Sequence, residues 1–461
     1  MRHQTRLLDI LDRAENGPIM DEMQWDMFFV PQTISDLIDE YDIHFDRMDG
    51  QLVSADDALA DRLFEAGLAM AERIGVYCTS TSRQLRWTRP EIIRAISAAP
   101  SEVTIGEGAD SFTERKRGIE DTKPVAIKGG GVGTVVPEPL YIPIHQAYAQ
   151  EPLLDALINC TLETVYGREI RSRSPWEIQA GWYEARTVRE ACIRAGRPGL
   201  GLGCVQNAVS EISELSADGD RGFGHYDWHH ITMVSEFKTD YSALNKLSHL
   251  ISAGHNIHSF YNTVYGGSAG GREGVAVAIV GGTLLLQMLY MTCTHSVSPV
   301  HPFYGNDTCA TILLPLSAAQ QALARNTGLL TEIALTPVGG PMTRTLLYET
   351  AALSILGTAS GTCGLLGPRS AVGAIPGHLS PLEARLMAET AHAAEGMPRN
   401  EADRIVRALY EKYENDLDKR PVGLSFEEVY DLRTLQPTAE WADLYEDVKT
   451  ELLKTGLPLK G

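Results

Sequence analysis

The chain has 461 residues, 44% of them apolar and 22% charged, so it can bury a large core and is not dominated by disorder. Forty Lys and Arg residues against 60 Asp and Glu give a formal net charge of -20, which disfavours nucleic acids and anionic membranes as partners. Seven widely spaced cysteines without a CxxC pair indicate reduced thiols, as expected in the cytoplasm.

The N-terminal part of the chain predicts helices. Its first residues, MRHQTRLLDILDRAENG, carry charges throughout and lack the apolar region of a signal peptide. Ser54 is the expected N-cap of the helix ALADRLFEAGLAMAER, whose apolar residues repeat on one face. We assign residues 1–73 to an N-terminal helical extension.

Strand-like and helical segments then alternate over residues 74–379. The expected strands are IGVYC (74–78), VTI (103–105), PVAIK (124–128), LETVY (162–166), PGLGLG (198–203), 257–261, 297–301 and 333–338. Helical periodicity is expected at DALINC (155–160), 175–196 and 242–254. The alternation predicts an α/β fold with a parallel sheet, either a (β/α)8 TIM barrel or an open doubly wound sheet. Residues 380–461 predict an acidic C-terminal helical extension packed on the barrel.

One segment, Gly274 to His295, contains no charged residue and is long enough to cross a membrane. Two adjacent glycines, several threonines and a glutamine interrupt it, and no cluster of basic residues follows it. We therefore expect a buried core helix here and no membrane partner.

Three groups of residues in the barrel region have chemical potential. KGGGVGT (128–134) and GRPGLGLG (196–203) match neither a P-loop nor a dinucleotide motif, and they predict tight turns at strand ends. HYDWHH (225–230) and HNIH (255–258) supply either metal ligands or hydrogen-bonded core histidines. Aromatic residues in the same region form either a cage for a quaternary ammonium ion or part of the core: Tyr226, Trp228, Phe260, Tyr261, Tyr265, Phe303 and Tyr304.

Motifs along almost the whole chain resemble one enzyme family. They include GVYCTSTSR (75–83), ERKRGIEDTKPVAIKGG (114–130), RTVREACIRAGRPGLGLG (186–203), SPVH (298–301) and SFEEVYDLRTLQPTAEW (425–441). These segments are similar to the monomethylamine:corrinoid-protein methyltransferases. The resemblance implies a (β/α)8 barrel with its site at the C-terminal mouth, and the transfer of a methyl group from an amine to Co(I) of a corrinoid. In that family the corrinoid is carried by a small partner protein, and the enzyme is a homo-oligomer, from dimer to hexamer.

The resemblance also implies where this chain departs from its family. Glycine stands at position 203, where the family has pyrrolysine directly after the RPG-x-G-x run. The acidic residues of the family pocket fall on Gln206, His230 and Phe260, and a glutamine falls on Ala334. Replacement of a large side chain and its polar neighbours together indicates a rebuilt pocket.

We therefore expect a cytoplasmic, pyrrolysine-free methyltransferase that acts on a quaternary or larger N-methyl amine. Gly203 would make room for this substrate, and no residue would act as a nucleophile, because cobalt is the nucleophile. The other expected substrate-binding residues are Gln206, Trp228, His230, His258, Phe260, Tyr261, His301 and Ala334. One alternative is a zinc-assisted O- or S-demethylating enzyme that uses His230 and His258. Another is a non-catalytic homologue that binds a corrinoid protein or a small ligand.

Overall fold

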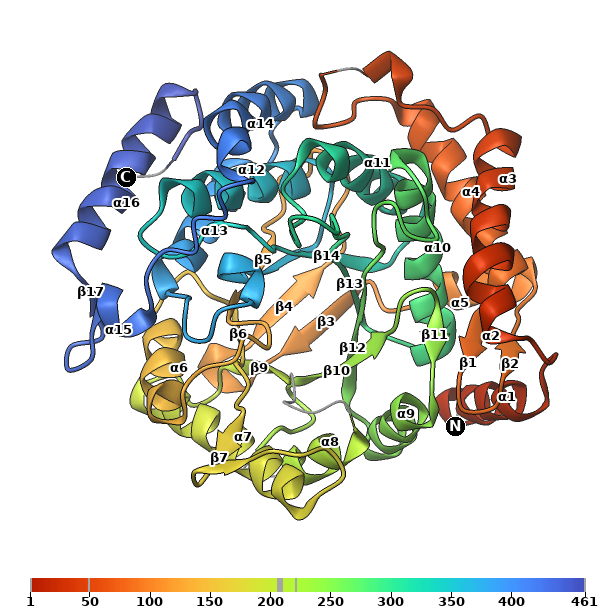
Figure 1. The fold of residues 1–461 in the computed structure, drawn as a ribbon, viewed down its shortest axis with the longest axis horizontal. Coiled ribbons are helices and arrows are strands. Elements are labelled where there is room, and N and C mark those ends of the chain that lie inside the picture. Colours follow the sequence, from red (N-terminus) through yellow and green to blue (C-terminus); the bar gives the residue numbers. More distant parts are fainter. Residues whose placement is uncertain (1, 49, 205–209, 220–221, 460–461) are drawn as a thin grey trace.

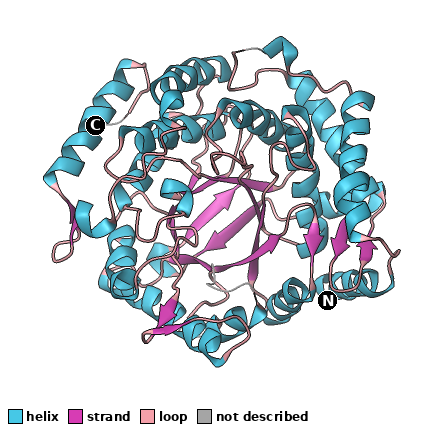
Figure 2. Ribbon diagram, in the orientation of Figure 1, coloured by secondary structure: helices cyan, strands magenta, loops and turns pink. Residues whose placement is uncertain are grey.

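The computed structural model describes residues 2–48, 50–204, 210–219 and 222–459. At its centre eight parallel strands close into a barrel, β15 pairing with β5 to complete the ring (Figures 1 and 2). Their bounds in barrel order are β5 (Ala126–Gly130), β6 (Ala156–Ile158), β9 (Gly201–Cys204), β10 (Trp228–Met233), β12 (Asn256–Tyr261), β13 (Thr294–Val297), β14 (Leu330–Ala334) and β15 (Gly364–Gly367). This arrangement confirms the (β/α)8 barrel and excludes the open sheet.

A helix follows each barrel strand and packs on its outside, as Figure 2 shows. The helices are α6 (Tyr141–Ala149), α7 (Pro175–Arg194), α8 (Glu211–Ala217), α9 (Tyr241–Ala253), α10 (Arg272–Tyr290), α11 (Ala310–Asn326), α12 (Arg344–Ala359) and α13 (Pro381–Ala393). The predicted C-terminal extension, residues 380–461, includes the last of these helices. In the structure α13 follows β15 and contacts β5 and α12, so it is the eighth helix of the barrel.

The chain before the barrel is longer than predicted. It forms α1 (Arg2–Asn16), α2 (Glu22–Gln24), α3 (Val30–Glu40), α4 (Asp57–Ile74), β1 (Val76–Cys78), β2 (Arg83–Leu85), α5 (Arg89–Ser97), β3 (Glu102–Ile105) and β4 (Phe112–Arg115). The predicted strand at 74–78 exists as β1, but it pairs with β2 and β11 (Lys238–Thr239) outside the barrel. Strands β3 and β4 form a hairpin that lies across the N-terminal end of the barrel (Figure 1).

Several local predictions were wrong. DALINC (155–160) contains strand β6 rather than a helix, and LETVY (162–166) contains β7 (Thr164–Val165), which pairs with β8 (Arg168–Glu169) outside the barrel. Strands β10 and β15 have no counterpart among the predicted strands. Strands β13 and β14 each begin three residues before the predicted strands 297–301 and 333–338. Apolar runs of three to five residues fit a strand and a buried helical turn equally well, so periodicity cannot separate them.

Residues 274–290 of the uncharged segment lie in α10, which packs between α4 and α11, whereas its last two residues, Thr294 and His295, begin β13. Among the described residues α10 is the one helix long and apolar enough to cross a membrane, and 94% of its most apolar window is buried inside the protein. This confirms a core helix. Helix α4, which packs on α10, is capped by Asp56 rather than by the predicted Ser54, and the Asp56 carboxylate accepts a hydrogen bond from the Leu59 amide.

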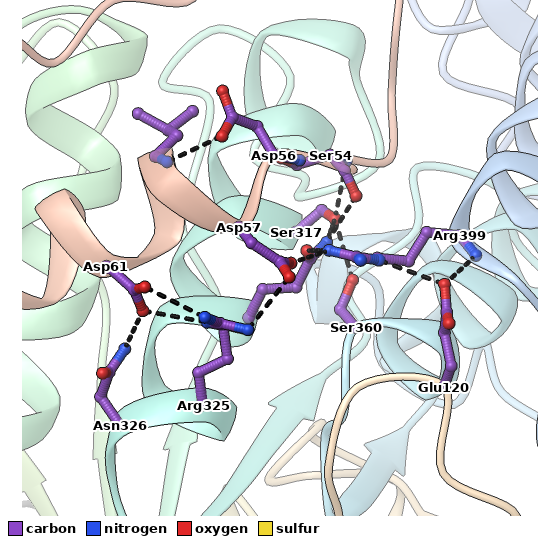
Figure 3. Close-up of polar contacts among 12 residues, drawn as sticks. Ser54, Asp56, Asp57, Asp61, Glu120, Ser317, Arg325, Asn326, Ser360 and Arg399 are labelled. Carbon is purple, nitrogen blue, oxygen red and sulfur yellow. Dashed lines mark hydrogen bonds and ion pairs between the residues drawn. The ribbon is translucent and has the colours of Figure 1, made fainter.

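The C-terminal extension consists of α14 (Arg399–Tyr413), α15 (Phe426–Val429), β16 (Tyr430–Asp431), β17 (Gln436–Pro437) and α16 (Ala439–Lys454). A polar network joins it to the rest of the chain (Figure 3). Asp57 of α4 pairs with Arg399 of α14 at 2.7 Å and with Arg325 of α11 at 3.0 Å, and Arg399 also reaches Glu120 at 3.2 Å. The two extensions are thereby connected to the same side of the barrel.

The segment between α14 and α15 also runs along the barrel rim. The amide of Gly340 donates to the carbonyl of Pro421 at 2.9 Å, and the amide of Leu424 donates to Pro341 at 2.9 Å. The Phe426 amide donates to Gly377 at 2.8 Å. The C-terminal extension therefore binds the loops that follow β14 and β15.

Candidate active site

A cavity of about 340 Å³ opens at the C-terminal ends of the barrel strands. Its walls follow from strand periodicity, because alternate residues of each strand point into the barrel. On β10 these are Trp228, His230 and Thr232, and on β12 they are His258 and Phe260. The remaining lining residues are Val132, Ile158, Gly203, Asn262, Ser298, Val300, Gly305, Ala334, Thr336, Leu366 and Arg369. Its position is that of the active sites of TIM-barrel enzymes.

Gly203 lies between two larger side chains. In the strand register it is the neighbour of Ile158 on one side and of Trp228 on the other. A Cβ atom at position 203 would lie 2.7 Å from Cζ2 of Trp228 and 3.0 Å from Cγ1 of Ile158. The volume that we expected glycine to leave for the substrate is therefore taken by the Trp228 ring.

Two histidines face the cavity side by side. His230 and His258 are register partners on β10 and β12, and their ring centroids are 5.3 Å apart. Burial lowers the pKa of both imidazoles well below the ordinary value, and the nearby Lys128 charge adds to this effect at His258. Both rings are therefore neutral at pH 7. His258 Nδ1 lies 2.8 Å from Thr294 Oγ1, and His230 Nε2 lies 2.8 Å from Thr232 Oγ1.

Below these residues a buried charge cluster forms the floor of the site. Lys128 of β5 forms ion pairs with Glu332 of β14 and, at 2.6 Å, with Glu114 of the hairpin that closes the barrel. All three side chains are fully buried. Burial and the neighbouring Glu332 together raise the pKa of Glu114 to about 8, against the lowering effect of Lys128. At neutral pH Glu114 is thus mainly protonated, although it lies within ion-pair distance of Lys128.

The same cluster contacts the cavity walls. Lys128 Nζ lies 4.7 Å from the ring centroid of Trp228, and Glu332 Oε2 lies 3.1 Å from Nδ1 of His258. Trp228 also meets His258 edge-on, with ring centroids 6.3 Å apart. The floor therefore fixes the positions of two side chains that line the cavity.

The mouth of the cavity carries a stack of aromatic rings. His301 is stacked between Tyr265 and Tyr304, with centroid distances of 5.4 and 4.6 Å. The adjacent Phe303 is 62% exposed, and the guanidinium of Arg420 lies 5.1 Å from its ring centroid. This part of the rim therefore carries a group of aromatic side chains, of which Phe303 is exposed.

The structure brings six of the predicted site residues together as cavity lining: Gly203, Trp228, His230, His258, Phe260 and Ala334. His301 belongs to the stack at the mouth. Gln206 lies outside the described residues. The prediction for Tyr261 was wrong: this ring stacks on Phe237 at 5.1 Å and packs against Gly282 of α10. It follows Phe260 in the strand and so points outward, to the helical layer.

The two histidines of HNIH also separate for this reason. His258 faces the cavity, whereas His255 lies outside the barrel beside Asp218, with 3.0 Å between its Nε2 and Oδ1 of the carboxylate. His249 reaches the same carboxylate at 2.8 Å. In the described part of the chain these three residues are the one group of three possible metal ligands. His230 and His258 are not joined by a third such ligand there.

Sequence reasoning missed four charged residues of the site: Lys128, Glu114, Glu332 and Arg369. A usable indication existed for Lys128 and Glu332, because each lies in a buried apolar strand, PVAIK and TEIAL. Charged residues are rarely buried unless they are paired, so two such strands predict a partner for each charge. Nothing in the sequence pairs these two residues with Glu114.

Comparisons with known proteins agree with this geometry. The family described as "Monomethylamine methyltransferase MtmB" matches residues 5–457. Monomethylamine methyltransferase MtmB1 of Methanosarcina barkeri and MtmB of Methanosarcina mazei are each 31% identical over 449 residues, which is 97% of this chain and 97% of each relative.

Two solved structures are also similar. The crystal structure of the Methanosarcina barkeri monomethylamine methyltransferase has a TM-score of 0.95 and 30% identity, covering 98% of both chains. The hydroxylamine complex of MtmB gives the same values. A match of this extent, in sequence and in fold, identifies the chain as a methyltransferase that belongs to the monomethylamine methyltransferase family.

Proposed function

We propose that this protein moves a methyl group from a quaternary or larger N-methyl amine to Co(I) of a corrinoid held by a partner protein, without pyrrolysine. The observation that carries the proposal is the lining of the cavity, where two aromatic rings and two neutral histidines meet. At about 30 Å³ per small heavy atom, monomethylamine would fill about 60 Å³. The cavity of about 340 Å³ is several times larger.

The chemistry of the leaving group supports a quaternary substrate. The corrinoid supplies a Co(I) nucleophile when the partner is bound. Transfer of the methyl group to that nucleophile would break its C–N bond, and the electron pair of this bond would remain on nitrogen. A quaternary ammonium ion thereby leaves as a neutral tertiary amine, so no proton donor is required. This agrees with neutral rather than acidic side chains at positions 230 and 260.

The residues of the cavity would bind and orient the cation. The faces of Trp228 and Phe260 attract an N-methyl cation, worth up to about 2 kcal/mol for a desolvated pair. Lys128 lies close to Trp228, but its charge is offset by Glu332, so it does not repel a bound cation strongly. A buried, mostly apolar pocket also excludes water from the reacting methyl group.

Aromatic side chains at the rim support contact with a macrocycle. The stacked rings of Tyr265, His301 and Tyr304 together with the exposed Phe303 form a group of aromatic side chains at the rim. We propose that these residues contact the corrinoid of the partner and hold it above the substrate. Membership of the family further supports a cytoplasmic homo-oligomer, which light scattering of the purified protein would test.

The test of the proposed function is spectroscopic. The protein is mixed with a reduced corrinoid protein or free cob(I)alamin and with mono-, di-, tri- and quaternary methylamines and methoxylated compounds. Conversion of the Co(I) absorption band to that of methyl-Co(III) is expected with a quaternary or larger N-methyl amine. Methylation from monomethylamine alone would contradict the proposed substrate, and methylation from a methoxylated compound alone would favour the zinc-assisted alternative.

A glycine-to-leucine pair provides the matched control. Leucine at position 203 must displace Trp228, so Gly203→Leu is expected to abolish turnover. Gly328 is exposed and has no atom within 4 Å of an added Cβ, so Gly328→Leu is expected to keep activity. Full activity of Gly203→Leu would contradict the role given to this wall of the cavity.

A further inference from the structure

One cavity residue has a charge that the described structure does not balance. Arg369 follows β15 and lines the cavity with its half-buried side chain. Its backbone is fixed by a 2.8 Å hydrogen bond from its amide to the carbonyl of Leu335. Its Nε is buried without a hydrogen-bond partner, and the guanidinium forms no ion pair with any described residue. Burial lowers its pKa, and no carboxylate offsets this effect.

Such an arginine is unusual and points to an anionic ligand. A guanidinium stays protonated at every physiological pH, and its partial removal from water costs free energy unless an anion compensates it. Other charged groups of the site are compensated: Lys128 has two carboxylates within ion-pair distance. Arg369 thus differs from Lys128 in having no counter-charge among the described residues.

The barrel topology places this cation opposite the aromatic wall. In the closed ring of eight strands, β15 and β10 are four strands apart in either direction, so they form opposite walls. Trp228 projects from β10, Phe260 from the adjacent β12, and Arg369 follows β15. One molecule that spans the cavity would therefore meet aromatic faces at one end and a guanidinium at the other.

We propose that the methyl donor is a zwitterion, a quaternary N-methyl ammonium compound that carries a carboxylate bound by Arg369. The inference rests on the proposed function and specifies the substrate class of the same site. The ammonium end faces Trp228 and Phe260, and the carboxylate accepts hydrogen bonds from the guanidinium, in a geometry that favours two parallel bonds. Methyl transfer leaves the carboxylate unchanged, so the tertiary amino acid product keeps the same anchor.

The binding experiment separates the two ends of the ligand and is done without corrinoid. Calorimetry compares trimethylammonium carboxylates with one, two or three methylene groups between the charges, their methyl esters, and tetramethylammonium. A hydrogen-bonded ion pair contributes about 1.5–3 kcal/mol. We therefore expect the best acid to bind about 10- to 150-fold more tightly than its ester.

Variants assign this preference to one residue. Arg369→Gln is expected to remove the preference for the acid while leaving the affinity for tetramethylammonium within about threefold. Arg369→Lys is expected to keep part of the preference for the acid, because lysine retains the charge but lacks the planar pair of donors of the guanidinium. Arg420→Gln is the matched control, since Arg420 lies at the rim on Phe303 and does not line the cavity. This variant is expected to keep the preference in full.

Different results overturn different parts of the reasoning. Equal affinity for acid and ester in the wild type, or a preference that survives Arg369→Gln, would overturn the zwitterion. Failure of tetramethylammonium and of every ester to bind would instead contradict the cation site of the proposed function. In a third outcome, Arg369→Gln leaves all amine affinities unchanged and alters only the dependence of methyl transfer on corrinoid concentration. In that case the anion that Arg369 binds belongs to the corrinoid, and its assignment to the substrate carboxylate is wrong.

Discussion

Gly203→Ala tests how tightly this wall of the cavity is packed. The new Cβ would lie 2.7 Å from Cζ2 and 3.0 Å from Cη2 of Trp228. Carbon atoms in contact are normally separated by about 3.5 Å, so the ring must retreat by about 0.8 Å. It has little freedom to do so, because Trp228 is 2% exposed, with Lys128 4.7 Å from its centroid and His258 against its edge.

The expected cost is that of overpacking a well-filled core, about 1–3 kcal/mol of unfolding free energy. Urea unfolding at 25 °C measures it, with Gly328→Ala as the control. Gly328 is exposed and has free space around it, so alanine there is expected to be neutral or to stabilise by up to about 1 kcal/mol.

A double-mutant cycle identifies the contact responsible. Trp228→Phe removes the six-membered ring of the indole, which contains both atoms that meet the new Cβ. In this background Gly203→Ala is expected to cost at least about 0.5 kcal/mol less than in the wild type. The reasoning is refuted if Gly203→Ala changes stability by less than about 0.5 kcal/mol, or if its cost is the same with phenylalanine at position 228.

Three further predictions concern charge. Lys128→Met removes the buried cation that pairs with Glu332 and Glu114 and is expected to cost about 3–5 kcal/mol. Arg399→Met, in the network that joins α14 to α4, should cost about 1 kcal/mol, and less at high salt. Equal urea midpoints for the two variants would contradict this. Because the pKa of Glu114 is raised, its contribution to stability is present below about pH 5 and is lost as pH rises to about 8, by up to about 1.4 kcal/mol per pH unit. Glu114→Gln should therefore make the measured dependence of the unfolding free energy on pH shallower. An unchanged slope would contradict the raised pKa. Ionised Glu114 favours a nearby cation, so calorimetry should show tetramethylammonium binding more tightly as pH rises through about 8 in the wild type, but not in Glu114→Gln.

The sequence was informative where a pattern extends over many residues. The long amphipathic segments predicted α7 and α9, and the family motifs predicted the barrel and the mouth at which the cavity lies. Strand β6 could not be predicted because three apolar residues have no measurable period. Tyr261 could have been excluded, since a residue next to inward-facing Phe260 must face outward on a strand.

The floor of the site was beyond sequence reasoning for another reason. The floor combines Lys128 of β5, Glu332 of β14 and Glu114 of the β3–β4 hairpin, which is not part of the barrel. These residues are separated by up to about two hundred residues along the chain. Their pairing depends on barrel closure, which no local pattern encodes. The same holds for Arg369, whose significance lies in the absence of a described partner rather than in any motif.

Closure of the barrel also constrains its synthesis. The first barrel strand, β5, pairs with β6 and with the last strand, β15. Strand β5 begins at Ala126 and β15 at Gly364, 238 residues later in the chain. At a synthesis rate of about 5–20 residues per second, one edge of β5 remains unpaired for about 12–48 s until β15 has been synthesised. An unpaired parallel strand edge is prone to aggregation during this time. Soluble yield is therefore expected to depend on chaperones that protect the nascent chain until residue 367 has emerged.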